Sequence, residues 1–306
     1  MNLFATIKNI TTSVKTAKEF WSSDLMGDIK SAVIYGNTCT YPANEVGRKN
    51  HEWGRKNFEG TYDKSTYEQF WRDGYLLAGQ LFDEDLIIKT RDEYLAALKS
   101  DALSDNGFDD PTIRANYNYG GYDGPVQGFR RDITDVARAM PTALLLPEDP
   151  RFKRLLTNIY GSDFMVAGVC SWRIYHVPKA VSDKFEATTN RLHFDDQMSD
   201  AVKVFVYLND VSEEHGPFQF FSRPYSRNLL WGGFKKDLRS SSLVGGLSPK
   251  LLENRNMIKH VGPMGSVALC ATPYCLHRAG ETAPGCSRDL LQFTFRPCVD
   301  GEMMSL

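Results

Sequence analysis

Residues 191–208, RLHFDDQMSDAVKVFVYL, join a candidate metal-binding motif to the clearest β-strand pattern in the chain. Ala201 to Leu208 consists largely of β-branched and aromatic residues, which predicts a strand. Alternate side chains of an extended segment share one face, so His193 and Asp195 point the same way. An imidazole and a carboxylate so placed make half of a metal site, which a second His from a distant strand would complete.

His277 is the candidate for that second His, and Arg288 follows it eleven residues later. Two His and one carboxylate on one side of an ion leave coordination positions open, which is the pattern of non-haem Fe(II) oxygenases. An H-x-D tripeptide alone is weak evidence, so the order and spacing of the three residues carry this hypothesis. The other histidines are interpreted as surface or structural residues: His51, His176, His215 and His260.

Arg288 begins a predicted strand whose alternate positions share its face: Leu290, Gln292 and Thr294. The planar guanidinium of Arg matches a carboxylate through two parallel hydrogen bonds and stays charged when buried. Two interpretations are open for this residue. It anchors the far carboxylate of a chelating 2-oxo acid, or it forms a salt bridge with Asp289 or Glu281.

The composition is that of an ordinary globular chain, with 306 residues, 42% hydrophobic residues and a formal net charge of −2. This charge gives no reason to expect nucleic acid as the main partner. The six Cys form no C-x-x-C pair, which argues against a zinc ribbon or a disulfide scaffold. No apolar run approaches the length of a membrane span, so a soluble, cytoplasmic protein is expected.

Residues 1–65 are predicted to be an N-terminal extension packed on the core. Residues 3–21 have the apolar period of an amphipathic helix, and residues 47–58 form a basic loop with aromatic residues. A membrane-surface helix and an anion- or nucleic-acid-binding loop are the less favoured interpretations. The rest of the chain, residues 66–306, is predicted to be one domain with a polar insertion at about 222–256.

Within that domain helices come first and strands later. A strand at 75–81 precedes a helix at 84–98, and helices are predicted at 132–140 and 150–160. Residues 104–128 are rich in Gly, Asn, Asp and Tyr and are a candidate cleft wall, especially 116–122. Short strands follow from residue 164. The pattern predicts an α+β chain with a mainly β core, a sheet sandwich or jelly roll flanked by N-terminal helices.

Several of these segments together resemble the phytanoyl-CoA dioxygenase family of Fe(II)/2-oxoglutarate oxygenases. The resemblance covers about residues 66–297, in consistent order. The matching motifs are Asp73-Gly-Tyr75, the H-x-D of His193 and Asp195, the strand and turn from Val202 to Pro217, Leu276-His-Arg-Ala-Gly280, and Arg288.

The resemblance implies a cupin-like double-stranded β-helix in which His193, Asp195 and His277 hold Fe(II). Arg288 would bind the C5 carboxylate of 2-oxoglutarate, and O2 would be the second co-substrate. The implied reaction hydroxylates or desaturates a C–H bond of a small molecule and releases succinate and CO2. Three further residues are candidates for co-substrate contacts: Thr294, Tyr175 and Arg173. Trp172 and Arg173 point to opposite faces of their strand, so only one of them can line the site.

The chain departs from the family pattern at three places. Ala279 stands where the family often has a hydroxyl-bearing residue, Phe221 to Tyr225 replaces the usual P-G-S-H, and residues 1–65 have no counterpart. Rival interpretations are a cupin-type metal protein that does not use 2-oxoglutarate and a non-enzymatic binding module on the same barrel. An oxygenase acting on nucleic acid or protein side chains would share the chemistry.

Overall fold

The computed structural model describes residues 53–99, 103–106, 130–176, 192–195, 200–226 and 255–298, with the backbone alone at 103–106. The predicted helix at 3–21, the first half of the basic loop, the candidate wall at 116–122 and most of the polar insertion lie outside this part of the chain. Within it, no helix combines the length and apolar character needed to cross a membrane.

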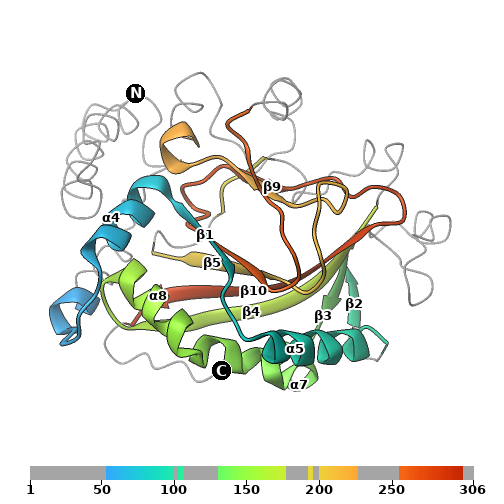
Figure 1. Cartoon of the computed structure of the whole chain (residues 1–306), viewed down its shortest axis with the longest axis horizontal. Coiled ribbons are helices and arrows are strands. Elements are labelled where there is room, and N and C mark those ends of the chain that lie inside the picture. Colours follow the sequence, from blue (N-terminus) through green and yellow to red (C-terminus); the bar gives the residue numbers. More distant parts are fainter. Residues whose placement is uncertain are drawn as a thin grey trace, which may run out of the picture.

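The following helices form one layer of the molecule (Figure 1). They are α4 (Lys64–Asp73), α5 (Glu84–Ala97), α7 (Val136–Ala139), the 3-10 helix η1 (Pro141–Glu148) and α8 (Pro150–Tyr160). Polar caps set the start of α4 and α8, because the Asp63 side chain accepts from the Ser65 backbone N–H and Asp149 accepts from Arg151 and Phe152. Gly74, at φ 83°, ends α4 in the left-handed conformation that favours glycine.

Two antiparallel sheets form the β core. The larger has seven strands in the order β1-β8-β5-β10-β4-β3-β2, and the smaller has the order β7-β6-β9. The strands of the large sheet are β1 (Tyr75–Gln80), β2 (Leu103–Asn106), β3 (Arg130–Ile133), β4 (Phe164–Tyr175), β5 (Val202–Tyr207), β8 (Ser266–Cys270) and β10 (Ser287–Pro297). Those of the small sheet are β6 (Phe218–Phe220), β7 (Ile258–His260) and β9 (His277–Ala279).

Strand alternation divides the packing between the two faces of the large sheet. Val202, Val204 and Val206 of β5 are fully buried in the cluster that packs against the helices. Phe205 belongs to a second cluster on the other face, together with Phe218 of the small sheet. The helices therefore cover one face of the large sheet, and the small sheet lies over the other (Figure 1).

The predicted α+β chain with a mainly β core and helices beside it is confirmed, and its two sheets are antiparallel. One helix boundary was wrong, since Asp132 and Ile133 belong to β3, and the helical residues begin only at Val136. Strand β2 likewise lies at the start of a region that was predicted to be irregular. In both places pairing with a neighbouring strand overrides the local preference of the sequence.

Candidate metal site and its cavity

Backbone pairing brings the H-x-D segment against the distal His. His193 and His277 exchange two backbone hydrogen bonds of 2.9 and 3.0 Å, and the Asp195 N–H donates to the Thr272 carbonyl at 3.3 Å. As a result, Oδ1 of Asp195 lies 3.8 Å from Nε2 of His193, and Oδ2 of Asp195 lies 3.6 Å from Nε2 of His277. The candidate ligand atoms of the three residues all lie within 4.8 Å of one another.

The protonation states of these groups suit metal binding. Nδ1 of His277 lies 2.8 Å from the Cys275 carbonyl, which can only accept, so this nitrogen carries the proton and Nε2 keeps its lone pair. Burial, together with the neighbouring His193, lowers the pKa of His277 to about 3. Burial alone would raise the pKa of Asp195, but its attraction to the His277 ring, whenever that ring is protonated, and to the Lys203 ammonium outweighs burial and holds the pKa below its ordinary value. A carboxylate therefore faces a neutral imidazole.

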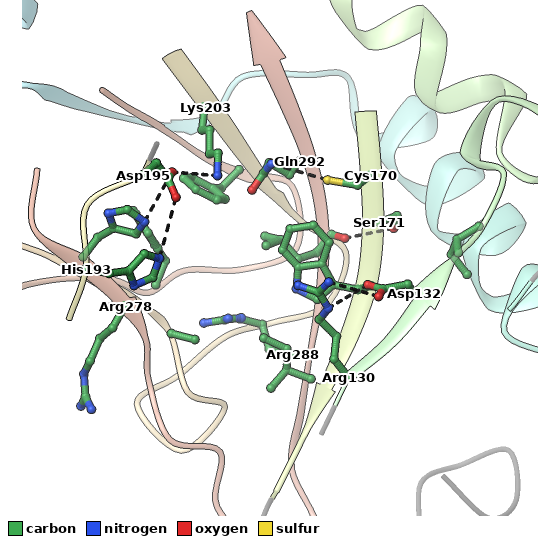
Figure 2. Close-up of a pocket in the computed structure, with 18 residues that line it drawn as sticks. Arg130, Asp132, Cys170, Ser171, His193, Asp195, Lys203, Arg278, Arg288 and Gln292 are labelled. Carbon is green, nitrogen blue, oxygen red and sulfur yellow. Dashed lines mark hydrogen bonds and ion pairs between the residues drawn. The ribbon is translucent and has the colours of Figure 1, made fainter. Parts of the chain in front are cut away.

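These residues form one side of a cavity of about 400 Å³ between the two sheets. Figure 2 shows His193, Asp195 and Lys203 on one side and Arg130 and Asp132 on the opposite side. Apolar side chains from both sheets line the space between them: Ile174, Phe205, Phe218 and Leu290. The size suits a small organic molecule better than a polymer.

Arg288 also lines this cavity. It is 2% exposed, and its Nη1 donates to the Gly216 carbonyl. Its Nε is buried without a hydrogen-bond partner, and no carboxylate in the described part of the chain pairs with it. Burial lowers the pKa of this guanidinium from its ordinary value, although Arg stays charged at neutral pH. A buried cation with an unsatisfied donor at a cavity wall is suited to an anionic ligand.

The salt bridge considered between Arg288 and Asp289 is absent, because Asp289 pairs with Arg173 instead. Nε and Nη2 of Arg173 donate to the two Asp289 oxygens at 2.6 and 2.8 Å, and the Tyr94 hydroxyl adds a bond of 3.0 Å. This network lies on the helix side of the large sheet.

The structure therefore corrects the prediction that Arg173 and Tyr175 contact the co-substrate, because neither lines the cavity. They alternate along β4 with Trp172 and Ile174, and it is Trp172 and Ile174 that line the cavity. Thr294 shares a sheet face with Arg288 but stands opposite Lys203 and Gly168, beyond the residues that line the cavity.

Sequence reasoning missed several polar residues of the cavity, and three of them stand out. Lys203 is the only charged residue in the apolar run of β5, at a position that alternation assigns to the face of Phe205, and this was an available signal. Arg130 and Asp132 form an ion pair of 2.8 Å, with the Arg130 guanidinium 4.9 Å from the centre of the Trp172 ring. Asp132 had been predicted to begin a helix.

Comparison with known proteins adds the fold class. No protein-family model matches the sequence, and no curated protein matches it significantly. Solved structures do share the fold. The epimerase SnoN in complex with Fe3+, alpha ketoglutarate and nogalamycin RO has a TM-score of 0.51 at 14% identity, covering 79% of this chain and 93% of that chain. The alpha ketoglutarate dependent carbocyclase SnoK from nogalamycin biosynthesis has a TM-score of 0.51 at 14% identity, covering 81% and 90%.

At these identities the likeness concerns the fold. The chain has the fold found in non-haem, alpha-ketoglutarate-dependent enzymes. Membership of the phytanoyl-CoA dioxygenase family stays a prediction.

Proposed function

We propose that the protein is an Fe(II)- and 2-oxoglutarate-dependent oxygenase that hydroxylates or desaturates a small molecule. One observation carries the proposal: His193, Asp195, His277 and an otherwise unpaired, buried Arg288 line the same cavity. Metal ligands alone would suit many metalloproteins. A buried cation in the same cavity adds a site for a carboxylate-bearing co-substrate.

The three candidate ligands suit Fe(II), because two imidazoles and one carboxylate are the ligand set of non-haem iron oxygenases. Bound Fe(II), 2-oxoglutarate and O2 would supply the oxidising chemistry. The chain supplies orientation: the Cys275 carbonyl sets the His277 tautomer, and the paired backbones of His193 and His277 hold both rings on one side of the cavity.

Arg288 would hold the C5 carboxylate of 2-oxoglutarate. Its hydrogen bond to Gly216 restrains the guanidinium, while Nε remains available for an acceptor. Arg288 and Leu290 stand on the same face of β10, so the co-substrate would extend along this strand over an apolar surface that excludes water.

The wall of Arg130, Asp132 and Trp172 is where the oxidised substrate would bind. Nε1 of Trp172 is buried without a partner in the described part of the chain, so it can donate to a substrate oxygen. The ion pair offers further donors and acceptors beside the indole ring. The structurally similar proteins are an epimerase and a carbocyclase, so this fold serves more than one kind of reaction.

The finer assignments belong to the same proposal. The two antiparallel sheets would form a double-stranded β-helix of the phytanoyl-CoA dioxygenase type, carried by residues 66–306 of a cytoplasmic protein. The N-terminal 65 residues would pack on this domain, and the insertion at about 222–256 would contribute to the substrate wall.

An anaerobic titration tests the proposal. Addition of Fe(II) and then 2-oxoglutarate to the full-length protein is expected to produce a weak visible charge-transfer band, because the 2-oxo acid chelates the metal. Under O2, a screen of candidate small molecules is expected to give substrate-dependent succinate. Absence of both the band and succinate would favour a binding module, whereas oxidation of a substrate without 2-oxoglutarate would favour a cupin-type metal enzyme.

A further inference from the structure

Lys203 makes a contact with the metal-site carboxylate that the proposed function does not require. Its Nζ lies 2.8 Å from Oδ2 of Asp195, and both side chains are only 14% exposed. Lys203 belongs to β5, which is distant in sequence from β9 and its His277. Figure 2 shows the ammonium directed at Asp195 from the side away from Arg288.

This contact distinguishes the two oxygens of Asp195. Oδ2 lies 2.8 Å from the Lys203 ammonium and 3.6 Å from Nε2 of His277, whereas Oδ1 lies 3.8 Å from Nε2 of His193. An ammonium at this ion-pair distance competes with a metal ion for the lone pairs of Oδ2. The Lys203 charge also opposes metal binding nearby, so the residue is a costly choice in a strand otherwise filled by apolar residues.

We propose that Lys203 is a positioning residue that holds Asp195 as a one-oxygen metal ligand, an inference that rests on the proposed metal site. A six-coordinate ion held by two imidazoles and one carboxylate oxygen keeps about three open positions. A chelating 2-oxo acid needs two of them, and O2 needs the third. A carboxylate that binds through both oxygens would occupy that third position. By engaging Oδ2, Lys203 keeps it open.

Mn(II) provides a probe that is independent of turnover, because metal-bound water raises the relaxation rate of bulk water protons. The variant Lys203→Met keeps the length and the apolar stem of the side chain but removes the ammonium. In the full-length wild-type protein, bound Mn(II) is expected to keep about three exchangeable waters. In Lys203→Met the relaxation enhancement is expected to fall by about a third, and Mn(II) affinity is expected to be equal or higher.

Two further variants make the comparison sharp. Lys203→Arg keeps a cationic donor and is expected to restore the wild-type relaxation enhancement. Lys259→Met removes another ion-paired lysine. Lys259 belongs to β7 of the small sheet, its side chain is 37% exposed, and its Nζ lies 2.7 Å from Oε2 of Glu213. This control is expected to leave Mn(II) binding and relaxation unchanged.

The outcomes separate this inference from the proposed function. An unchanged relaxation enhancement in Lys203→Met at equal Mn(II) affinity would overturn the inference and leave the oxygenase proposal standing. Weaker Mn(II) binding with a lower melting temperature would also overturn it, because it would assign Lys203 to stability alone. A wild-type protein that binds no Mn(II) would instead remove the metal site itself.

Discussion

Arg288 and Asp289 are neighbours on β10, and both are almost fully buried, yet their surroundings are opposite. Asp289 faces the helices, where Arg173 and Tyr94 satisfy both of its oxygens. Arg288 faces the cavity, where its Nε has no partner in the described part of the chain. A buried charge that the chain itself neutralises is a structural element of the fold, whereas a buried charge left without a counter-ion beside a cavity indicates a ligand.

The largest effect is expected for Arg288→Met. Truncation of a buried, hydrogen-bonded partner of a carboxylate costs about 2–5 kcal/mol of binding, so 2-oxoglutarate-dependent succinate formation is expected to fall by about thirtyfold or more. The melting temperature should change little, because the removed group satisfies only one carbonyl of the chain. Wild-type succinate yields in this variant would contradict the assignment of Arg288 to the co-substrate.

Arg173→Met should have the reverse profile. It leaves the Asp289 carboxylate buried without its guanidinium, which typically destabilises a protein by about 3–5 kcal/mol. Denaturant unfolding measures this loss, and the double variant Arg173→Met/Asp289→Leu is expected to recover much of it because no unpaired charge remains. Loss of 2-oxoglutarate affinity at temperatures where Arg173→Met is fully folded would place Arg173 in the site after all.

A third expectation concerns the pH dependence of stability, which the guanidinium of Arg288 influences through His260. Burial, with the nearby charge of Arg288, lowers the pKa of His260 from 6.5 to about 4. The unfolded chain therefore binds a proton first as the pH falls, so stability is complete above pH 6.5 and declines toward pH 4. At about 1.4 kcal/mol per unit of pKa, the loss is at most roughly 3 kcal/mol.

The variant His260→Phe should flatten this part of the pH–stability profile. The Tyr207 hydroxyl bonds the backbone carbonyl of residue 260, so that contact survives the substitution. Urea midpoints between pH 4 and 7 provide the measurement. In Arg288→Met the decline should level off at a higher pH and be smaller, since loss of the cation brings the folded-state pKa of His260 closer to 6.5. Parallel profiles for wild type and His260→Phe would show that other groups set the pH dependence.

The smallest effect is expected for Thr294→Val. Thr294 stands on the cavity side of β10 but outside the cavity lining, so the affinity for 2-oxoglutarate should stay within about twofold and stability within about 0.5 kcal/mol. Titration of the charge-transfer band checks the affinity. A clear loss would mean that the co-substrate extends farther along β10 than the Arg288 anchor requires.

Much of the candidate site could be predicted from the chain alone. His193 and Asp195 share a face by strand alternation, and the late His277 and Arg288 stand in the order that such a site needs. The strand from Val202 to Tyr207 was evident from its β-branched and aromatic residues. These features are local, and local geometry is what a sequence pattern reports.

Tertiary structure decided the rest. Alternation shows that Trp172 and Arg173 face opposite ways, but only the packing of the helices against β4 places Trp172 in the cavity and Arg173 beside Asp289. The contact of Lys203 with Asp195 likewise depends on how β5 meets the H-x-D segment in space. Side-chain alternation along a strand is set by the local sequence. Which face of the sheet lines the cavity depends instead on which distant elements cover the other face.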